Sequence, residues 1–323
     1  MNRKLLSFLV ISCIALSLFT GCAFKEPQKQ TIHIGCMKGP TAIGMIHLLS
    51  ESDAGNSLHA YDYTIAGAAD ELSAALIKGE LDIASVPCNL ASILYHKTEG
   101  EIVTVAINTL GVLYLVESGD SIQTVSDLKG KTIYSTGQGT TPEYTLRYLL
   151  SCANLNPDTD VTIEYKSEAA EVVATLAQNP NAVAMLPQPY VMVALQNNQN
   201  LRIALDITTE WESLAGTTIV TGVIVARKSF LEENQGVYQD FLKEYEASAN
   251  YANTNIDDTA DLLEQYDIFK SAIAKKAIPY CNVVYLTGDT MKDNVMAYLQ
   301  VLYNQNPASI GGSLQEGMFY LEN

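Results

Sequence analysis

The stretch STGQGTTPEY, residues 135–144, combines two glycines with four Ser or Thr hydroxyls and a proline. It follows a run typical of a strand and precedes a run typical of a helix. Thr141 is a suitable N-cap and Pro142 a suitable first helical residue, so free backbone N–H groups would carry the positive end of a helix dipole here. Three hypotheses follow: the loop binds a phosphate for chemistry, it binds a transported solute, or it only turns the chain.

Nucleotide chemistry is disfavoured by the spacing of this loop. A phosphate-binding P-loop requires GxxxxGK[ST], and no lysine follows Gly139. The dinucleotide pattern GxGxxG fails as well, because Pro142 stands where the third glycine belongs. Glu143 would compete with an anionic ligand for the helix dipole, or would face a cationic group on the ligand. A solute-binding loop and a plain turn remain open.

Catalytic and metal-binding patterns are missing from the rest of the sequence. The four histidines, at 33, 47, 59 and 96, lie on different expected elements and share no spacing. There is no HExxH, no GxSxG and no CxxC pair. We therefore expect a protein that is not an enzyme and that binds no cofactor and no metal.

The N-terminus has the pattern of an export signal. Arg3 and Lys4 precede a nearly continuous apolar run over residues 5–19, and SLFTGC closes it with a sequence similar to a bacterial lipobox. We predict a signal peptide over residues 1–21, a diacylglycerol (and palmitate) anchor on Cys22 and a polar tether over residues 22–30. Ordinary secretory cleavage, with Cys22 as an incidental thiol, is the alternative.

The net charge disfavours two classes of binding partner, and the cysteine content raises the question of a disulfide. The chain carries 19 basic and 36 acidic residues, a formal charge of −17, which disfavours contact with nucleic acid or anionic lipid through the fold itself. The folded part contains Cys36, Cys88, Cys152 and Cys281. An oxidising compartment would permit a Cys36–Cys88 disulfide, but buried free thiols are the favoured prediction.

From residue 31 onward, short apolar runs alternate with helical patterns. TIHIGC, YDYTIA and LDIASV are each followed by an amphipathic segment, and the same order recurs after residue 131 with KTIYS and VTIEY. This alternation predicts an α/β fold with two mostly parallel sheets flanked by helices. After residue 229 the pattern is helical to the end of the chain, with no further strand expected.

Two extended runs, GVLYLVE and TTIVTGVIVARKS, lie between the two series. They predict two hinge strands that connect one lobe, of residues 31–110 and 225–323, with an inserted second lobe of residues 111–224. Two tandem domains are the rival arrangement. In open α/β sheets, ligands bind beyond the carboxyl ends of the strands, so a cleft between the lobes is the expected site.

The order of several motifs resembles the substrate-binding lipoproteins of bacterial ABC importers that serve nitrate, sulfonates, taurine and thiamine precursors. The motifs on which the resemblance rests include ALIKGELDIASVPCNLA, SDLKGKTIYSTGQGTTPEYTLRYLL, AVAMLPQPYVMVA and VTGVIVARKSFLEEN. The resemblance implies a type II periplasmic-binding-protein fold whose two lobes close on a small solute. It also implies an ABC permease and its ATPase as partners, and a location outside the cytoplasm on a lipid anchor.

The resemblance and the strand ends together nominate cleft residues. Gln188 stands where relatives usually carry glutamate, which removes one negative charge from the presumed cleft. The candidate ligand-binding residues are Lys38, Gly39, Thr41, Pro87, Asn89, Gly137, Gln138, Gly139, Thr140, Thr141, Gln188 and Thr221.

The leading hypothesis is a solute-binding lipoprotein that delivers a small polar or heteroaromatic solute to an ABC importer. An enzyme similar to thiamine-pyrimidine synthases of the same fold is one alternative, although the cysteine-rich motif of those enzymes is missing. A sensory solute-binding subunit is the other alternative.

Overall fold

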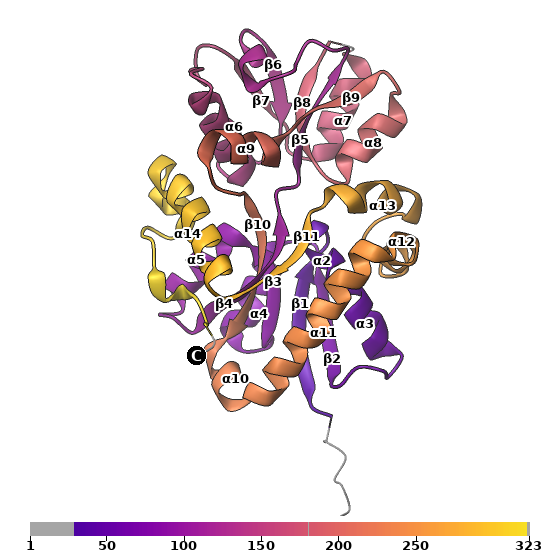
Figure 1. Ribbon diagram of the computed structural model, residues 1–323, viewed down its shortest axis with the longest axis vertical. Helices are drawn as coiled ribbons and strands as arrows, with labels where there is room; N and C mark the ends of the chain where they lie inside the picture. The colour runs from indigo at the N-terminus through magenta and orange to yellow at the C-terminus, as the bar shows by residue number, and fades with distance from the viewer. Residues whose placement is uncertain (1–28, 180, 322–323) are drawn as a thin grey trace, which may run out of the picture. The chain divides into compact units, whose positions relative to one another are not determined.

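The computed structural model describes residues 29–179 and 181–321 (Figure 1). The predicted signal peptide, the predicted lipidation at Cys22 and nearly all of the predicted tether lie outside the described residues. The chain divides into a unit of residues 1–30 and a unit of residues 31–323, and both sheets belong to the second unit.

The first sheet has six strands in the order β11-β4-β10-β3-β1-β2. β1 pairs in parallel with both β2 and β3, whereas β10 pairs antiparallel with β3 and β4, and β11 antiparallel with β4. The strands are β1 (Thr31–Met37), β2 (Ala60–Ala66), β3 (Ile83–Pro87), β4 (Ile102–Leu110), β10 (Val220–Arg227) and β11 (Val283–Leu286).

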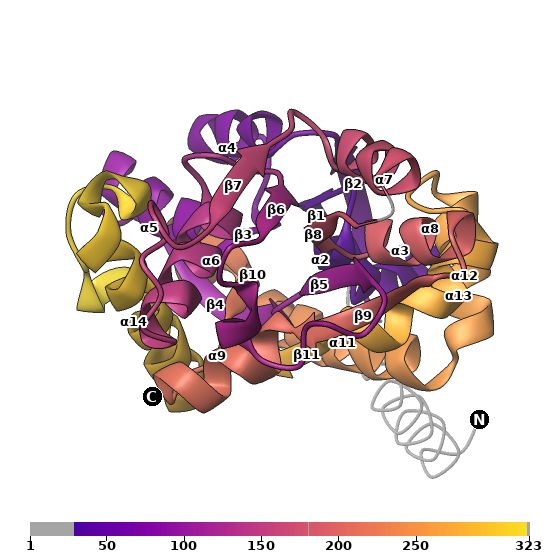
Figure 2. The ribbon, with the colours of Figure 1, turned by 90° about the horizontal axis from the view of Figure 1, so that it is seen from above.

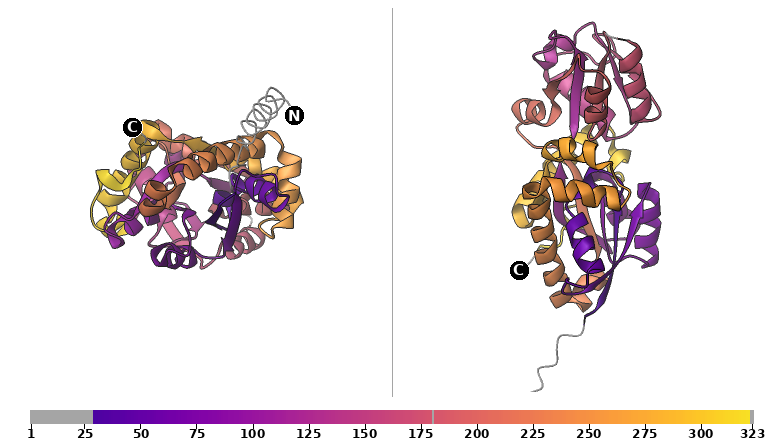
Figure 3. Two further views of the ribbon diagram at one scale, coloured as in Figure 1. Left: turned by 90° about the horizontal axis from the view of Figure 1, so that it is seen from below. Right: turned by 90° about the vertical axis from the view of Figure 1, so that its right-hand side faces the viewer.

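The second sheet has five strands in the order β7-β6-β8-β5-β9. β6 pairs in parallel with β7 and β8, and β5 pairs antiparallel with β8 and β9. The strands are β5 (Leu113–Ser118), β6 (Thr132–Ser135), β7 (Thr162–Tyr165), β8 (Val183–Pro187) and β9 (Leu201–Asp206). Each sheet forms one lobe with its helices, and the side view shows the lobes one above the other (Figure 3).

The two-lobed α/β fold is confirmed, with one correction. Four strands of each sheet run in one direction, and the strands that run against their neighbours are β5 and β10, which carry the chain from one lobe to the other, and the edge strand β11. The segment after residue 229 is not wholly helical, because Val283–Leu286 forms β11 at the edge of the first sheet. A run of four residues is too short to show a strand period by itself, and pairing with β4 decides its conformation.

Helices cover both faces of the sheets. In the first lobe, α5 and α14 lie on one side of the strands and α3 and α12 on the other (Figure 2). The helices are α2 (Pro40–Ile43), α3 (Ile46–Asp53), α4 (Ala69–Lys78), α5 (Cys88–Lys97), α6 (Thr141–Cys152), α7 (Ala169–Gln178), α8 (Tyr190–Asn197), α9 (Ile207–Ala215), α10 (Lys228–Glu233), α11 (Gln235–Thr254), α12 (Ile256–Gln265), α13 (Ser271–Ala277) and α14 (Gly288–Gln305), with short 3-10 turns η1 (Val125–Leu128), η2 (Ile278–Tyr280), η3 (Pro307–Ile310) and η4 (Glu316–Met318).

Burial on both faces explains the continuous apolar character of the central strands. In β10, Ile224 belongs to one buried cluster, whereas its neighbours Val223 and Val225 belong to the other. Successive side chains of a strand point to opposite faces, so a strand covered on both sides is apolar at most positions.

The chain crosses between the lobes twice, at residues 111–112 between β4 and β5 and at residues 216–219 between α9 and β10. Asn282 bonds to the first crossing: its side-chain Nδ2 donates to the carbonyl oxygen of Gly111 at 2.6 Å, and its own carbonyl accepts from the N–H of Leu110 at 3.1 Å. The crossings therefore carry defined hydrogen bonds rather than a free linker.

Helix α4 offers a test of the packing that places one wall of the cleft. Leu72 is fully buried in this helix, so Leu72→Ala should lower the free energy of unfolding by about 2–5 kcal/mol through lost burial and the cavity left behind. Ile77, on the same helix, is 53% exposed, and Ile77→Ala should change the free energy by less than about 0.5 kcal/mol. Urea denaturation measures both, and equal losses would contradict the packing described here.

Candidate functional site

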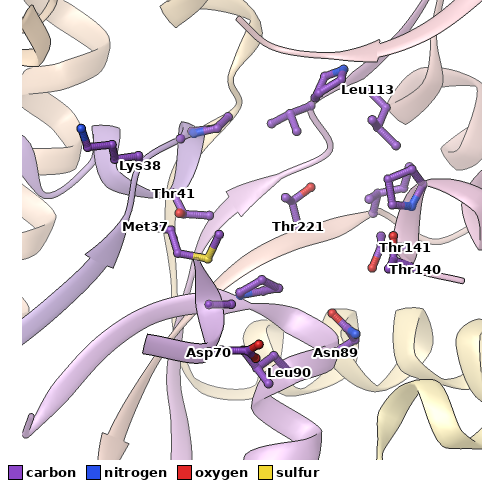
Figure 4. A pocket seen from close by; sticks show the side chains of 18 residues that line it. Met37, Lys38, Thr41, Asp70, Asn89, Leu90, Leu113, Thr140, Thr141 and Thr221 are labelled. Carbon is purple, nitrogen blue, oxygen red and sulfur yellow. The ribbon is translucent and has the colours of Figure 1, made fainter. Parts of the chain in front are cut away.

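A cavity of about 540 Å³ lies where the carboxyl ends of strands from both sheets face each other (Figure 4). Its walls come from the segment after β1, the start of α4, the β3–α5 junction, the two crossings, the start of α6 and the end of β8. The lining residues are Met37, Lys38, Gly39, Pro40, Thr41, Ala69, Asp70, Pro87, Asn89, Leu90, Val112, Leu113, Thr140, Thr141, Pro142, Pro187, Ile219 and Thr221.

The cavity brings together eight of the twelve nominated residues. These residues come from both lobes and are Lys38, Gly39, Thr41, Pro87, Asn89, Thr140, Thr141 and Thr221. Gly137, Gln138, Gly139 and Gln188 do not line it. A role in ligand binding remains a prediction for all of them.

Several apolar residues of the cavity wall and one charged residue were not identified from the sequence. Val112 and Ile219 belong to the crossings and Leu113 begins β5, in runs whose apolar character is equally typical of a core strand. Asp70 follows the second strand, in the first turn of α4, and is not among the nominated residues. Its position after a strand that ends at the cleft was the available signal.

The glycine loop that suggested an anion site satisfies its own hydrogen bonds. The N–H of Gly139 donates to Glu143 Oε2 at 2.6 Å, and the Thr140 hydroxyl donates to the carbonyl oxygen of Gly137 at 2.6 Å. Gly137 and Gly139 both have φ of +74°, which glycine adopts readily. The loop therefore turns tightly onto the helix and uses Glu143 as the partner of a backbone donor that a ligand would otherwise take.

The start of α6 lies one residue earlier than predicted. Thr140 is the N-cap and Thr141 the first helical residue, whereas the sequence pattern placed the N-cap at Thr141. The Thr140 side chain makes no capping bond to the helix, because its hydroxyl is already bonded to Gly137. The tight turn of the loop therefore sets the position at which the helix begins.

Gln188 is buried beside the cleft rather than in it. It is 1% exposed, and its backbone N–H donates to the carbonyl oxygen of Val112 at 3.0 Å. Neither polar atom of its side chain has a hydrogen-bond partner among the described residues. A glutamate at this position would therefore place its charge in the interior of the second lobe and not in the cavity wall.

The charged groups of the cavity wall carry no net positive charge. Lys38 Nζ forms an ion pair with Asp267 Oδ2 at 2.7 Å, and the hydrogen bond and charge of Lys38 lower the pKa of that carboxyl. Asp70 adds a carboxylate at the first turn of α4. A ligand entering the cavity meets one paired cation and one acid.

The rest of the wall is apolar with hydroxyl groups on both sides. Thr41 lies in α2, Thr141 at the start of α6 and Thr221 at the start of β10, and Figure 4 shows them around the same space. Asn89 is held by donation of its side-chain N–H to the carbonyl oxygen of Ser309 at 3.2 Å. No aromatic ring is among the lining residues that the structure describes. The Trp211 side chain is fully buried elsewhere, and its ring N–H donates to Thr217 Oγ1 at 2.9 Å.

Asn108 of β4 supports the cavity from behind and was not identified from the sequence. It is 1% exposed, and its Nδ2 donates to the carbonyl oxygen of Thr41 and to Ser85 Oγ, both at 3.0 Å. These two bonds tie β4 to the neighbouring part of the first sheet, through Ser85 of β3, and to helix α2, through Thr41. A single asparagine inside an apolar strand gives no sequence sign of such a role.

The thiols and the titratable clusters show no sign of redox or metal chemistry within the described residues. Cys36 and Cys88 are buried free thiols, as predicted, and burial raises the pKa of the Cys36 thiol to about 12. No group of three His, Cys, Asp or Glu side chains within residues 29–179 and 181–321 could hold a metal ion. No described helix is long and apolar enough to cross a bilayer.

Comparison with known proteins identifies a family and several solved structures that share the fold of this chain. The model of a family described as menaquinone biosynthesis matches residues 32–299. The crystal structure of an ABC transporter protein from Parabacteroides distasonis is 26% identical, with a TM-score of 0.76, and the match covers 91% of this chain and 99% of that one. No curated protein matches the chain.

Two further structures share the fold at lower identity. The periplasmic aliphatic sulphonate binding protein SsuA from Escherichia coli is 18% identical with a TM-score of 0.72, and the match covers 91% of this chain and 92% of that one. The periplasmic nitrate-binding protein NrtA from Synechocystis PCC 6803 is 12% identical with a TM-score of 0.63, covering 90% and 85%. They confirm the two-lobed periplasmic-binding-protein fold.

Replacing Asn108 tests the support of the cavity. Asn108→Ala should lower the free energy of unfolding by about 1–3 kcal/mol, because the Thr41 carbonyl and the Ser85 hydroxyl lose a buried donor. Asn181 is exposed in a loop, and Asn181→Ala should cost less than about 0.5 kcal/mol. Chemical denaturation measures the difference, and an Asn108→Ala protein as stable as the wild type would show that the two bonds contribute nothing.

Proposed function

The chain belongs to the family described as menaquinone biosynthesis, and from this membership and its fold we propose that it captures a small solute between its lobes and delivers it to an ABC importer. The observation that carries the proposal is the cavity itself. Both lobes and both crossings contribute to its wall, so one ligand can contact groups that are able to move relative to each other.

Capture follows from the distribution of the lining groups. A solute that bonds to Thr41 in the first lobe and to Thr141 in the second stabilises the arrangement in which these groups lie close together. Such a ligand shifts the population toward the closed state by its difference in affinity for the two states. We propose that residues 31–110 and 225–323 move as one lobe and residues 111–224 as the other.

A few contacts join the lobes at the two flanks of the crossings, where Figure 1 shows α14 and α13. On one flank, Asn306 Nδ2 donates to the Tyr144 hydroxyl at 2.8 Å, Gln305 Nε2 donates to the Tyr144 carbonyl oxygen at 3.0 Å, and the rings of Trp211 and Tyr298 pack 5.7 Å apart. On the other flank, the Tyr114 hydroxyl donates to the carbonyl oxygen of Tyr280 at 2.9 Å. Each of these hydrogen bonds contributes only about 0.5–1.5 kcal/mol, so contacts with a ligand can compensate for their exchange.

Delivery requires a partner at the membrane. The lipobox-like SLFTGC supports a lipid anchor on Cys22, which would keep the protein outside the cytoplasm next to the importer. The permease and its ATPase would distinguish the closed protein from the open one. The Parabacteroides distasonis protein, solved as an ABC transporter, supports this assignment, since it is similar over nearly its whole length.

An enzyme acting on a menaquinone precursor is the second candidate, favoured by the description of the family. Asp70 is the carboxylate in the cavity wall, and in that role it would move a proton to or from the bound molecule. The two candidates differ in one respect: a carrier releases the molecule that it bound, whereas an enzyme releases a different one.

Solute capture predicts a ligand-dependent melting temperature. The full chain should be stabilised by the low-molecular-mass fraction of a culture extract, by about 2.7 kcal/mol at one hundred times the dissociation constant. Thr141→Val with Thr221→Val removes hydroxyls from both sides of the cavity and should weaken binding about tenfold or more, since two hydrogen bonds are lost. Thr162→Val, on the exposed edge strand β7, serves as the matched control and should bind normally.

Mass spectrometry of the released molecule then separates the two candidates. An unchanged mass after prolonged incubation supports the carrier, and a new mass that appears in proportion to protein supports the enzyme. If the extract stabilises wild type, the double variant and the control equally, the cavity is not the binding site.

A further inference from the structure

We infer that the cavity selects an uncharged solute with an aliphatic body and several oxygen acceptors, and that it rejects sulfonate, nitrate and similar anions. This inference rests on the proposed function, because it names the class of solute that the proposed capture would serve. Three features of the cavity wall carry it: its charge, its backbone donors and its apolar surface.

The charge of the wall opposes an anion. Lys38 is the one lysine or arginine among the described lining residues, and its ammonium is already paired with Asp267 at 2.7 Å. Asp70 contributes a carboxylate to the same wall. An entering sulfonate would therefore meet one cation that is already shared and two carboxylates nearby, and desolvation of its charge would not be compensated.

One backbone donor of the second lobe, the N–H of Gly139 next to the lining residue Thr140, is already used. Glu143 lies in the first turn of α6 and accepts from the N–H of Gly139 at 2.6 Å, so the helix start that faces the cavity has its own carboxylate. An anion at this loop would have to displace Glu143 and remain next to it. In the first lobe, α4 likewise carries Asp70 and Glu71 in its first turn, which offsets the positive end of its dipole.

Helix α5 is the exception and points to a neutral acceptor. Its first turn contains no acidic residue and its N-cap, Pro87, makes no side-chain bond, so no side chain caps the backbone N–H groups at this helix start, which lies beside the lining residues Asn89 and Leu90. A carbonyl, ether or hydroxyl oxygen takes such a donor without bringing a full charge into the cavity. The threonine hydroxyls of both lobes donate and accept, which suits the same kind of group.

The remaining wall favours an aliphatic body. Met37, Leu90, Val112, Leu113 and Ile219 supply aliphatic or thioether surface, and the described lining contains no ring for stacking. A cavity of about 540 Å³ is within the range of roughly 300–1,000 Å³ that small-molecule sites occupy. The burial of carbon surface therefore supplies the affinity, and the hydroxyls fix the orientation.

Separating a culture extract by charge tests the inference directly. Anion and cation exchangers at neutral pH divide the low-molecular-mass extract into acidic, basic and neutral fractions. The neutral fraction should raise the melting temperature of the full chain and give a non-covalent adduct in native mass spectrometry. Methanesulfonate and sodium nitrate, each added alone, should leave the melting temperature unchanged.

Ionic strength and Asp267→Asn provide a second measurement on whichever fraction binds. Asp267 lies outside the cavity wall, and its replacement frees the charge of Lys38. A neutral solute should change its affinity by less than about twofold in this variant, and by less than about twofold between ionic strengths of about 0.01 M and 1 M. An anion should bind more tightly to the variant and lose affinity with salt.

The outcomes separate this inference from the proposed function. Binding by the neutral fraction, insensitive to salt, supports both. Binding by the acidic or the basic fraction alone overturns the neutral class while solute capture stands. If no fraction and neither salt changes the melting temperature or gives an adduct, solute capture fails and the inference fails with it.

Discussion

The backbone passes between the two sheets at residues 111–112 and again at residues 216–219, and this double connection constrains the rest of the molecule. Gly111 sits at the first crossing with the side chains of Thr208 and Ile219 against it, so a side chain at this position has no room. Asn282 closes the third side through its bond to the Gly111 carbonyl. Because both crossings are held this closely, the strand ends of the two lobes face one another across a single cavity.

The chemistry of that cavity follows from which groups are already satisfied. In the wall, the Lys38 ammonium pairs with Asp267, and outside the wall Glu143 accepts from the N–H of Gly139, so two groups that would bind an anion already have acidic partners in the protein. Threonine hydroxyls and apolar side chains are what remains for a ligand. The sulfonate- and nitrate-binding proteins share the fold at 18% and 12% identity, a level at which the architecture is common and the wall of the site is not.

Local patterns were sufficient for much of the fold and for part of the site. The strand and helix periods of TIHIGC, YDYTIA and LDIASV predicted β1, β2 and β3, and the ends of β1 and β3 led to Lys38, Thr41 and Asn89 in the cavity wall. The same logic failed where a segment depends on a distant partner. β11 forms only because β4 presents an open edge, and Asn108 acquires its role only because Thr41, far away in sequence, lies beside it.

The sequence by itself determined that the chain is an α/β protein of two lobes with its candidate site at the strand ends, because residue periodicity and turn composition are local properties. It also contained Gly137, Gly139 and Glu143 within seven residues, without showing which donor meets which acceptor. Only the tertiary structure decided that Glu143 turns back onto Gly139, that Gln188 is buried beside the cleft and that Asp70 joins its wall. The physical reason is that hydrogen bonds and burial depend on distances between segments, which spacing along the chain does not specify.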